Sequence, residues 1–261
     1  MRPANQVQYH PRGSVRHWMQ HRHKHRHIRY FTRMRHKSIL SANQYVKSVL
    51  MLLTSEEIKA ANHRLKTASA SDIVRWAVGL GSSTVATTSF GPNSGALLHV
   101  IAKTTPKLPI IWVDSGYNVP DCYRTADQLT RDLQLNLHVY TPTMTAERRT
   151  ALDGGIPTLD ETDRHRRFTR DVKLEPFQRA LSEHKPKVWI SGIRKTETEH
   201  RQSLDIVSVD GRGVLKVAPL FHWSDAHVES YMREHNLPSC KHYFDPTKVI
   251  AGRECGLHTA A

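Results

Sequence analysis

The sequence is poor in cysteine and has no long apolar run, and each absence excludes a class of protein. Its 261 residues include three cysteines, Cys122, Cys240 and Cys255, with no C-x-x-C spacing. Such a set predicts neither a disulfide framework nor a zinc or iron–sulfur site. No stretch of 18 apolar residues is present, so we expect no transmembrane helix. No secretory signal is recognisable either, and these features together predict a reducing, cytoplasmic compartment.

Acidic residues are absent from residues 1–50, which hold 11 Lys and Arg and seven His. The rest of the chain carries 27 basic and 24 acidic residues, so most of the formal charge of +14 belongs to this leader. We expect a segment of this composition to be disordered. It fits a nucleic-acid arm, a metal-binding His tract, an organelle presequence, or translated upstream sequence with the functional start near Met51. We favour the last interpretation, because domain-like sequence begins directly after that methionine.

Helical and extended patterns alternate from residue 54 onward. Strands are predicted over 84–90, 108–113, 137–140 and 187–192, with a hairpin over 205–217 that turns at Asp210-Gly211. Helices are predicted over 55–65, 71–79, 94–102, 120–133, 175–183 and 225–235, and no element is predicted in the polar stretch 160–171. Strands separated by helices favour a doubly wound, mostly parallel α/β sheet. We therefore expect a nucleotide-binding domain over 51–236 and a mobile tail over 237–261.

The first candidate binding loop joins a predicted strand to a predicted helix. It contains Ser89, Phe90, Gly91, Asn93 and Ser94. Ligands of parallel sheets bind at the edge where such turns lie. Gly91 can adopt positive φ, and Asn93 or Ser94 can cap the helix, whose free N–H groups form an anion cradle. The pattern is also that of an ordinary strand–turn–helix corner.

Two further polar loops follow strands and are expected at the same edge. Asp114, Ser115 and Gly116 follow the second strand, where Asp114 suits either ribose hydroxyls or the backbone N–H groups of its own turn. Arg194 and Arg201 lie in a basic loop after the fourth strand, and guanidinium groups suit phosphate and sulfate oxygens. A solvated charged loop is the alternative for this second case.

The three cysteines have different expected roles. Cys255 is close to the end of the chain and is followed by Gly256, so its backbone is free to move. A thiol placed in this way suits reaction with one partner inside a pocket and another outside it. Cys122 is expected to be a small buried side chain in a helix. Cys240 is either a bystander, which we favour, or a partner that protects Cys255 as a disulfide.

Six short motifs together carry a family resemblance. They are Ser89-Phe90-Gly91, Asp114-Ser115-Gly116-Tyr117, Lys173-Leu174-Glu175-Pro176, Gly192-Ile193-Arg194 with Arg201, Lys216-Val217-Ala218-Pro219-Leu220, and Glu254-Cys255-Gly256-Leu257-His258. In this order they resemble sulfonucleotide reductases, most closely the branch that acts on phosphoadenylyl sulfate (PAPS). The resemblance implies an adenine nucleotide alpha hydrolase-like fold, frequently as a homodimer, with thioredoxin or glutaredoxin as reductant.

The resemblance also implies roles for particular residues. Cys255 would attack the sulfur of PAPS, form an S-sulfocysteine and release adenosine 3′,5′-bisphosphate, and a donor thiol would then release sulfite. His258 would orient or activate the tail, or simply cap it, and Lys173 would join the loops at the substrate.

Two departures from the family pattern bear on cofactor and tail. The adenylyl-sulfate (APS) branch carries two cysteine pairs that bind an iron–sulfur cluster. Here Phe168-Thr169 stands in the place of the first pair and there is no second pair. We therefore expect no cofactor, no metal and PAPS as substrate. The tail is also short, with 14 residues between Cys240 and Cys255.

Two other functions remain open at this point. Another enzyme of the same fold, such as an ATP sulfurylase subunit or a thiolation enzyme, would be expected to keep a Ser-Gly-Gly-x-Asp-Ser type of loop, which this sequence lacks. A nucleic-acid-binding protein is supported only by residues 1–50. Neither a nucleic acid nor a membrane is therefore an expected partner.

Overall fold

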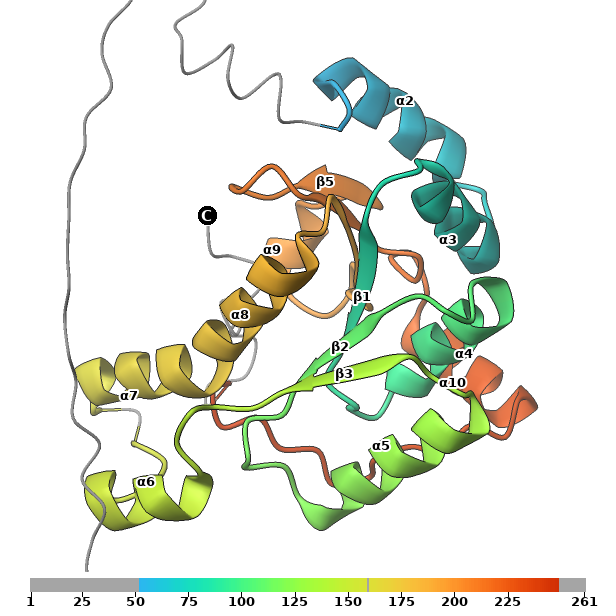
Figure 1. Cartoon of the computed structure of the whole chain (residues 1–261). Helices are drawn as coiled ribbons and strands as arrows, with labels where there is room; N and C mark the ends of the chain where they lie inside the picture. Colours follow the sequence, from blue (N-terminus) through green and yellow to red (C-terminus); the bar gives the residue numbers. More distant parts are fainter. Residues whose placement is uncertain (1–51, 159, 249–261) are drawn as a thin grey trace, which may run out of the picture. The chain divides into compact units, whose positions relative to one another are not determined.

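The chain forms a six-stranded sheet in the order β3-β2-β1-β4-β6-β5, part of which is visible in Figure 1. This computed structural model describes residues 52–158 and 160–248, so the leader, Cys255 and His258 lie outside the described residues. The strands are β1 (Thr84–Thr88), β2 (Ile110–Val113), β3 (Leu137–Tyr140), β4 (Val188–Ile190), β5 (Val207–Val209) and β6 (Leu215–Val217). All neighbours pair in parallel except β5 and β6, which form the predicted hairpin. The mostly parallel sheet expected from the sequence is confirmed.

Helices cover both faces of the sheet, which explains the apolar character of β2. Ile110 packs into a core that includes residues of α3, α4, α5 and α10. Its neighbour Ile111 points the other way, into a second core with Phe177 and Leu181 of α8. Successive side chains of a strand alternate between faces, so a strand buried on both sides needs apolar residues throughout.

Most helices begin where capping residues predict. They are α2 (Ser55–Leu65), α3 (Ala70–Gly79), α4 (Ser94–Thr104), α5 (Pro120–Asp132), α6 (Ala146–Asp153), α7 (Thr162–Thr169), α8 (Glu175–His184), α9 (Glu199–Gln202) and α10 (Asp225–Glu234). Thr54 forms a full capping box with Glu57, Pro120 opens α5, and the Ser224 side chain caps α10. Gly95 lets α10 approach α4, because a Cβ there would lie 2.9 Å from Met232 Cε.

The polar stretch 160–171 is helical, contrary to the sequence prediction. It forms α7 and runs into a π-helix, Arg170–Leu174. His165, Phe168 and Val172 are buried at helical spacing, although the residues around them are charged. The high charge of this stretch therefore concealed a narrow apolar face. Helix α6 was likewise absent from the sequence prediction.

The end of α8 provides a test of backbone strain. Lys185 is its C-cap and has φ 45° and ψ 52°, in the left-handed region. The left-handed conformation costs a residue with a Cβ roughly 1–2 kcal/mol of steric strain. Glycine avoids this strain, and its main cost is about 0.5–1 kcal/mol of conformational entropy lost on folding. Lys185→Gly should therefore stabilise the protein by about 0.5–1 kcal/mol in urea unfolding. Lys185→Ala keeps the strain and is the control; equal stability of the two variants would contradict this account.

Candidate active site

A cavity of about 260 Å³ lies where β1, β2 and β4 end, at the carboxyl edge of the sheet. It takes residues from the loops after β1 and β4, from α4, α8 and α10, and from the segment 243–248. The residues predicted to bind substrate that line it are Ser89, Gly91, Asn93, Ser94, Lys173, Arg194 and Arg201. The loops after β1 and β4 thus meet at this cavity, whereas the predicted turn at residues 114–116 contributes no lining residue. Contact of these residues with substrate stays a prediction.

The loop after β1 differs in detail from its prediction. Positive φ occurs at Phe90, at 49°, and not at Gly91. Phe90 is fully buried and packs edge-on against Trp112, with ring centroids 4.9 Å apart, so the turn directs its side chain into the core rather than the cavity. Asn93 occupies the N-cap position of α4 without a side-chain capping bond, and the Ser94 N–H donates to the Gly91 carbonyl. The expected cap by Asn93 or Ser94 is therefore not formed.

Asp114 holds the turn after β2 together. Its Oδ1 accepts hydrogen bonds from the Gly116 N–H at 3.0 Å, Asn118 Nδ2 at 2.9 Å and the Tyr123 hydroxyl at 2.9 Å. Burial, together with this bond to a carboxylate, raises the pKa of Tyr123 to about 12. Asp114, Ser115 and Gly116 are not among the cavity-lining residues. The structure thus shows the turn-holding role of Asp114, and a ribose contact stays a prediction.

The loop after β4 buries its two arginines. Arg194 and Arg201 are 4% and 6% exposed, so the solvated-loop alternative is wrong for both. Glu197 lies between them: Arg194 Nη2 is 3.5 Å from Oε1, and Arg201 Nη1 contacts Oε2. Arg194 Nη1 also lies 2.7 Å from Oδ1 of Asp225, at the start of α10. Glu197 is therefore the shared counter-ion of two buried cations.

Lys173, on the π-helix, is a third buried cation at this cavity. Its Nζ lies 2.7 Å from Oδ2 of Asp245, and the side chains are 10% and 5% exposed. Burial alone would raise the pKa of Asp245, but the charge and hydrogen bond of Lys173, with bonds from Thr247, lower it. Asp245 Oδ1 accepts from the Thr247 N–H at 3.0 Å and from its hydroxyl at 2.7 Å. The carboxylate is thus held charged inside the protein.

The segment 237–248 is anchored, which corrects the predicted start of the mobile tail. The Ser239 hydroxyl donates to the Pro92 carbonyl at 2.9 Å, and the Lys241 N–H donates to Asp121 at 2.8 Å. These contacts tie it to the loop after β1 and to α5. Residues 249–261, including Cys255 and His258, lie outside the described residues, so their mobility and roles remain predictions.

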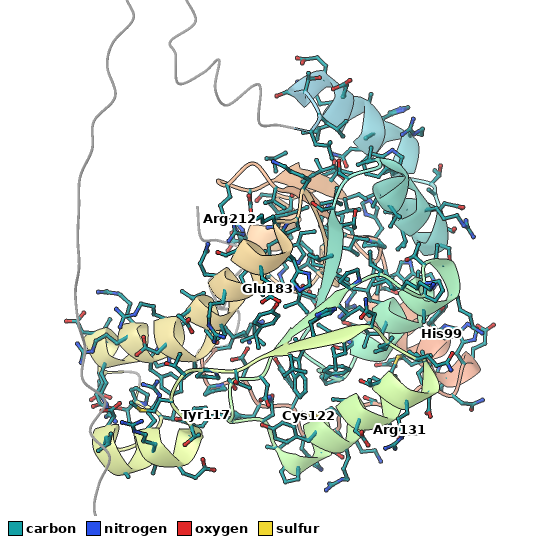
Figure 2. The ribbon with its side chains drawn as sticks, in the orientation of Figure 1. His99, Tyr117, Cys122, Arg131, Glu183 and Arg212 are labelled. Carbon is teal, nitrogen blue, oxygen red and sulfur yellow. A yellow bond between two sulfur atoms is a disulfide. The ribbon has the colours of Figure 1, made fainter. Side chains whose placement is uncertain are left out.

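A disulfide joins Cys122, in the first turn of α5 (Figure 2), to Cys240. Their Cα atoms are 5.1 Å apart although 118 positions separate them in sequence. The expected burial of Cys122 in a helix is confirmed, since it is fully buried in α5. The expectation that Cys240 is a bystander is wrong, and so is its alternative pairing with Cys255. Sequence spacing gave no signal for this bond, because only the fold brings α5 beside the segment 237–248. Cys255 is therefore the one cysteine of the three that takes no part in this disulfide.

Sequence reasoning missed several side chains at the cavity. Glu197, Tyr243, Asp245 and Lys248 line it, and so does Ser191, which is 3% exposed. The Ser191 hydroxyl has no hydrogen-bond partner among the described residues. Leaving such a group unsatisfied costs roughly 1–3 kcal/mol, which a ligand or water would recover. In the sequence, the position of Ser191 directly after β4 is the one signal that would have indicated a place at the cavity.

The described residues contain no group of three or more His, Cys, Asp or Glu side chains placed to hold a metal ion. Within residues 52–158 and 160–248, no helix is long and apolar enough to cross a membrane.

Comparison with known proteins identifies the family. A family model described as the phosphoadenosine phosphosulfate reductase domain matches residues 83–255. The chain belongs to this family. A phosphoadenosine 5′-phosphosulfate reductase of Synechocystis is 36% identical over 201 residues, 77% of this chain and 80% of the relative. One from Photobacterium profundum is 36% identical over 183 residues, 70% of this chain and 72% of that protein.

A solved structure shows the same fold. The crystal structure of phosphoadenylyl-sulfate reductase from Candida auris, a phosphate complex, is 29% identical to this chain. It aligns with a TM-score of 0.64, covering 72% of this chain and 90% of the other. The adenine nucleotide alpha hydrolase-like fold implied by the sequence motifs is thus confirmed.

The Lys173–Asp245 pair should be needed for stability. Lys173→Met leaves a buried carboxylate without its cation and should cost about 3–5 kcal/mol, whereas Lys173→Met/Asp245→Asn removes both charges and should recover most of the loss. Because folding lowers the pKa of Asp245, its contribution is present above the unfolded value and is lost as pH falls through the folded value. Urea unfolding from pH 7 to pH 3 tests both points. Equal losses in the single and double variants would refute the pairing.

The Cys122–Cys240 disulfide should stabilise the segment 237–248. The double variant Cys122→Ala/Cys240→Ala should lose about 2–4 kcal/mol, the usual contribution of a disulfide. Alkylation of unfolded, unreduced wild type should label Cys255 alone, and prior reduction should expose the other two thiols. Cys255→Ser is the control, with unchanged stability expected. Three labelled cysteines without reduction would show that the bond does not form.

Proposed function

We propose that this protein reduces PAPS to sulfite and adenosine 3′,5′-bisphosphate at the cavity on the carboxyl edge of the sheet. The observation that carries the proposal is the gathering of three buried cations, Lys173, Arg194 and Arg201, at one cavity. Guanidinium and ammonium groups of this kind suit the phosphate and sulfate oxygens of such a substrate. The relatives named as PAPS reductases, and the phosphate complex of the Candida auris reductase, support the same substrate class.

In the proposed mechanism the Cys255 thiolate attacks the sulfur of the sulfate–phosphate anhydride. A sulfur–sulfur bond forms, the bond from sulfur to the bridging oxygen breaks, and adenosine 3′,5′-bisphosphate leaves with the electron pair. A thiol of the donor then attacks the Cys255 sulfur and releases sulfite. A second donor thiol resolves the mixed disulfide, so the donor is oxidised by two electrons.

The buried cations lower the barrier to the first step. Bringing two unit anions to about 4 Å costs roughly 4 kcal/mol at an effective dielectric of about 20. Arg194 and Arg201 offset this repulsion when they bind the substrate anions. An ordinary thiol of pKa about 8.5 is only a few per cent ionised at pH 7, so a positive site also favours the thiolate. His258 would orient or activate the tail, or cap it.

The proposed partners are PAPS, thioredoxin or glutaredoxin as the thiol donor, and a second copy of the chain in a homodimer. We also propose that the enzyme works without an iron–sulfur cluster, since a Cys₄ site needs more than its three cysteines. A cytoplasmic location belongs to the proposal too. The Cys122–Cys240 disulfide is unusual for that compartment and would there be open to reduction.

The function is tested by sulfite release from PAPS and from APS with reduced thioredoxin. PAPS should be the preferred substrate, and Cys255→Ser should abolish sulfite formation while nucleotide binding persists. Incubated with PAPS but without reductant, wild type should gain one sulfo group, about 80 Da by the mass of SO₃, on the peptide that contains Cys255. This is expected because the thiolate is the reactive form of cysteine, and no donor thiol is present to release sulfite. The variant Cys122→Ala/Cys240→Ala is the control and should carry the same adduct. Turnover surviving in Cys255→Ser would overturn the mechanism.

A further inference from the structure

Glu197 occupies the anion position between the two buried arginines of the cavity. Its Oε1 lies 3.5 Å from Arg194 Nη2, and its Oε2 contacts Arg201 Nη1. Oε2 also accepts a hydrogen bond from the backbone N–H of Arg194 at 3.0 Å. One carboxylate therefore uses donors on two cations and on the loop backbone, which are the groups that an incoming phosphate or sulfate would need.

The two cations are more deeply buried than the carboxylate that lies between them. The side chains of Arg194 and Arg201 are 5% and 7% exposed, but that of Glu197 is 29% exposed. Arg194 also has a second carboxylate nearby, since its Nη1 lies 2.7 Å from Oδ1 of Asp225, whose side chain is mostly exposed. Glu197 belongs to the loop between β4 and α9, and rotation of its side chain would carry the carboxylate into solvent.

A buried guanidinium needs an anion at all times. Leaving a buried charge without its partner is strongly destabilising. Carboxylates and phosphates both accept paired hydrogen bonds from arginine, so the two compete for the same donors. A ligand anion that enters this part of the cavity must therefore displace Glu197 and take over its role as counter-ion.

We propose that Glu197 is a resident counter-ion that a phosphate or sulfate group of the substrate displaces, so that it sets the affinity of the site for anions. The identity of that substrate rests on the function proposed above, whereas the exchange of anions rests on the contacts of Glu197. In this account Glu197 weakens binding of every anionic ligand, and it also stabilises the empty protein.

The test compares Glu197→Gln with Glu199→Gln. The first variant keeps the shape of the side chain and removes its charge. The second removes a charge two residues away, at the start of α9, from an exposed residue that forms no ion pair among the described residues. Isothermal titration with adenosine 3′,5′-bisphosphate should give a Kd about tenfold lower for Glu197→Gln, since one charge-assisted bond is of that order. Glu199→Gln should stay within about twofold of wild type, the usual size of a surface charge effect.

Thermal melting supplies a second readout. Without ligand, Glu197→Gln should melt below wild type. With saturating ligand the difference should shrink, because in both proteins the ligand then replaces the side chain of residue 197 as the partner of the arginines. If Glu197→Gln does not fold, Glu197→Asp, which draws the carboxylate back by one methylene, replaces it with the same expected direction. Weaker or unchanged binding in the Glu197 variant, or equal tightening in Glu199→Gln, would overturn the proposal.

Inorganic phosphate separates this proposal from the proposed function. Tighter phosphate binding by Glu197→Gln, with no binding of adenosine 3′,5′-bisphosphate to either protein, would support the anion exchange and reject the nucleotide substrate. If neither ligand binds Glu197→Gln more tightly than wild type, the exchange is rejected even where sulfite is formed.

Discussion

The burial of positive charge at the carboxyl edge of the sheet is the constraint on which the site depends. Three cations with little solvent exposure, Lys173, Arg194 and Arg201, line one cavity. Charges removed from water need partners, and each has a carboxylate within contact, from Glu197 or Asp245. The loops around the cavity must therefore position carboxylates as accurately as they position the cations. The loop after β4 supplies Glu197 with its two arginines, and the π-helix supplies Lys173.

The segment 237–248 is the second half of this arrangement. It carries Asp245, the counter-ion of Lys173, and it is joined to α5 through Cys240. Without this segment the cavity would lose one wall and Lys173 would lose its anion. The same segment precedes Cys255 in the sequence, so the residues that lead to Cys255 start from an anchored position. A domain boundary placed at 237 would separate groups that stabilise one another.

The sequence predicted what depends on local pattern. The strands of the parallel sheet, the cap at Thr54 and the loop cluster at the sheet edge all follow from periodicity and short-range chemistry. It could not predict contacts between distant segments, such as Cys122 with Cys240 or Lys173 with Asp245. Helix α7 was missed because only two of its residues, His165 and Phe168, are buried in a run of charges. Glu197 was visible as a charge, but its position between two buried arginines depends on the fold.

Occupied counter-ion positions have a consequence for selectivity. The chain beyond the leader has a formal charge of only +3, so long-range attraction of anions is modest and recognition depends on the cavity. In the anion exchange proposed above, a ligand must replace through its own oxygens the stabilisation that Glu197 provides in the empty protein. A ligand with a single carboxylate would gain little binding free energy, since one carboxylate would merely replace another. A ligand with several phosphate or sulfate oxygens would gain more, so the resident anion discriminates by charge and geometry rather than by attraction alone.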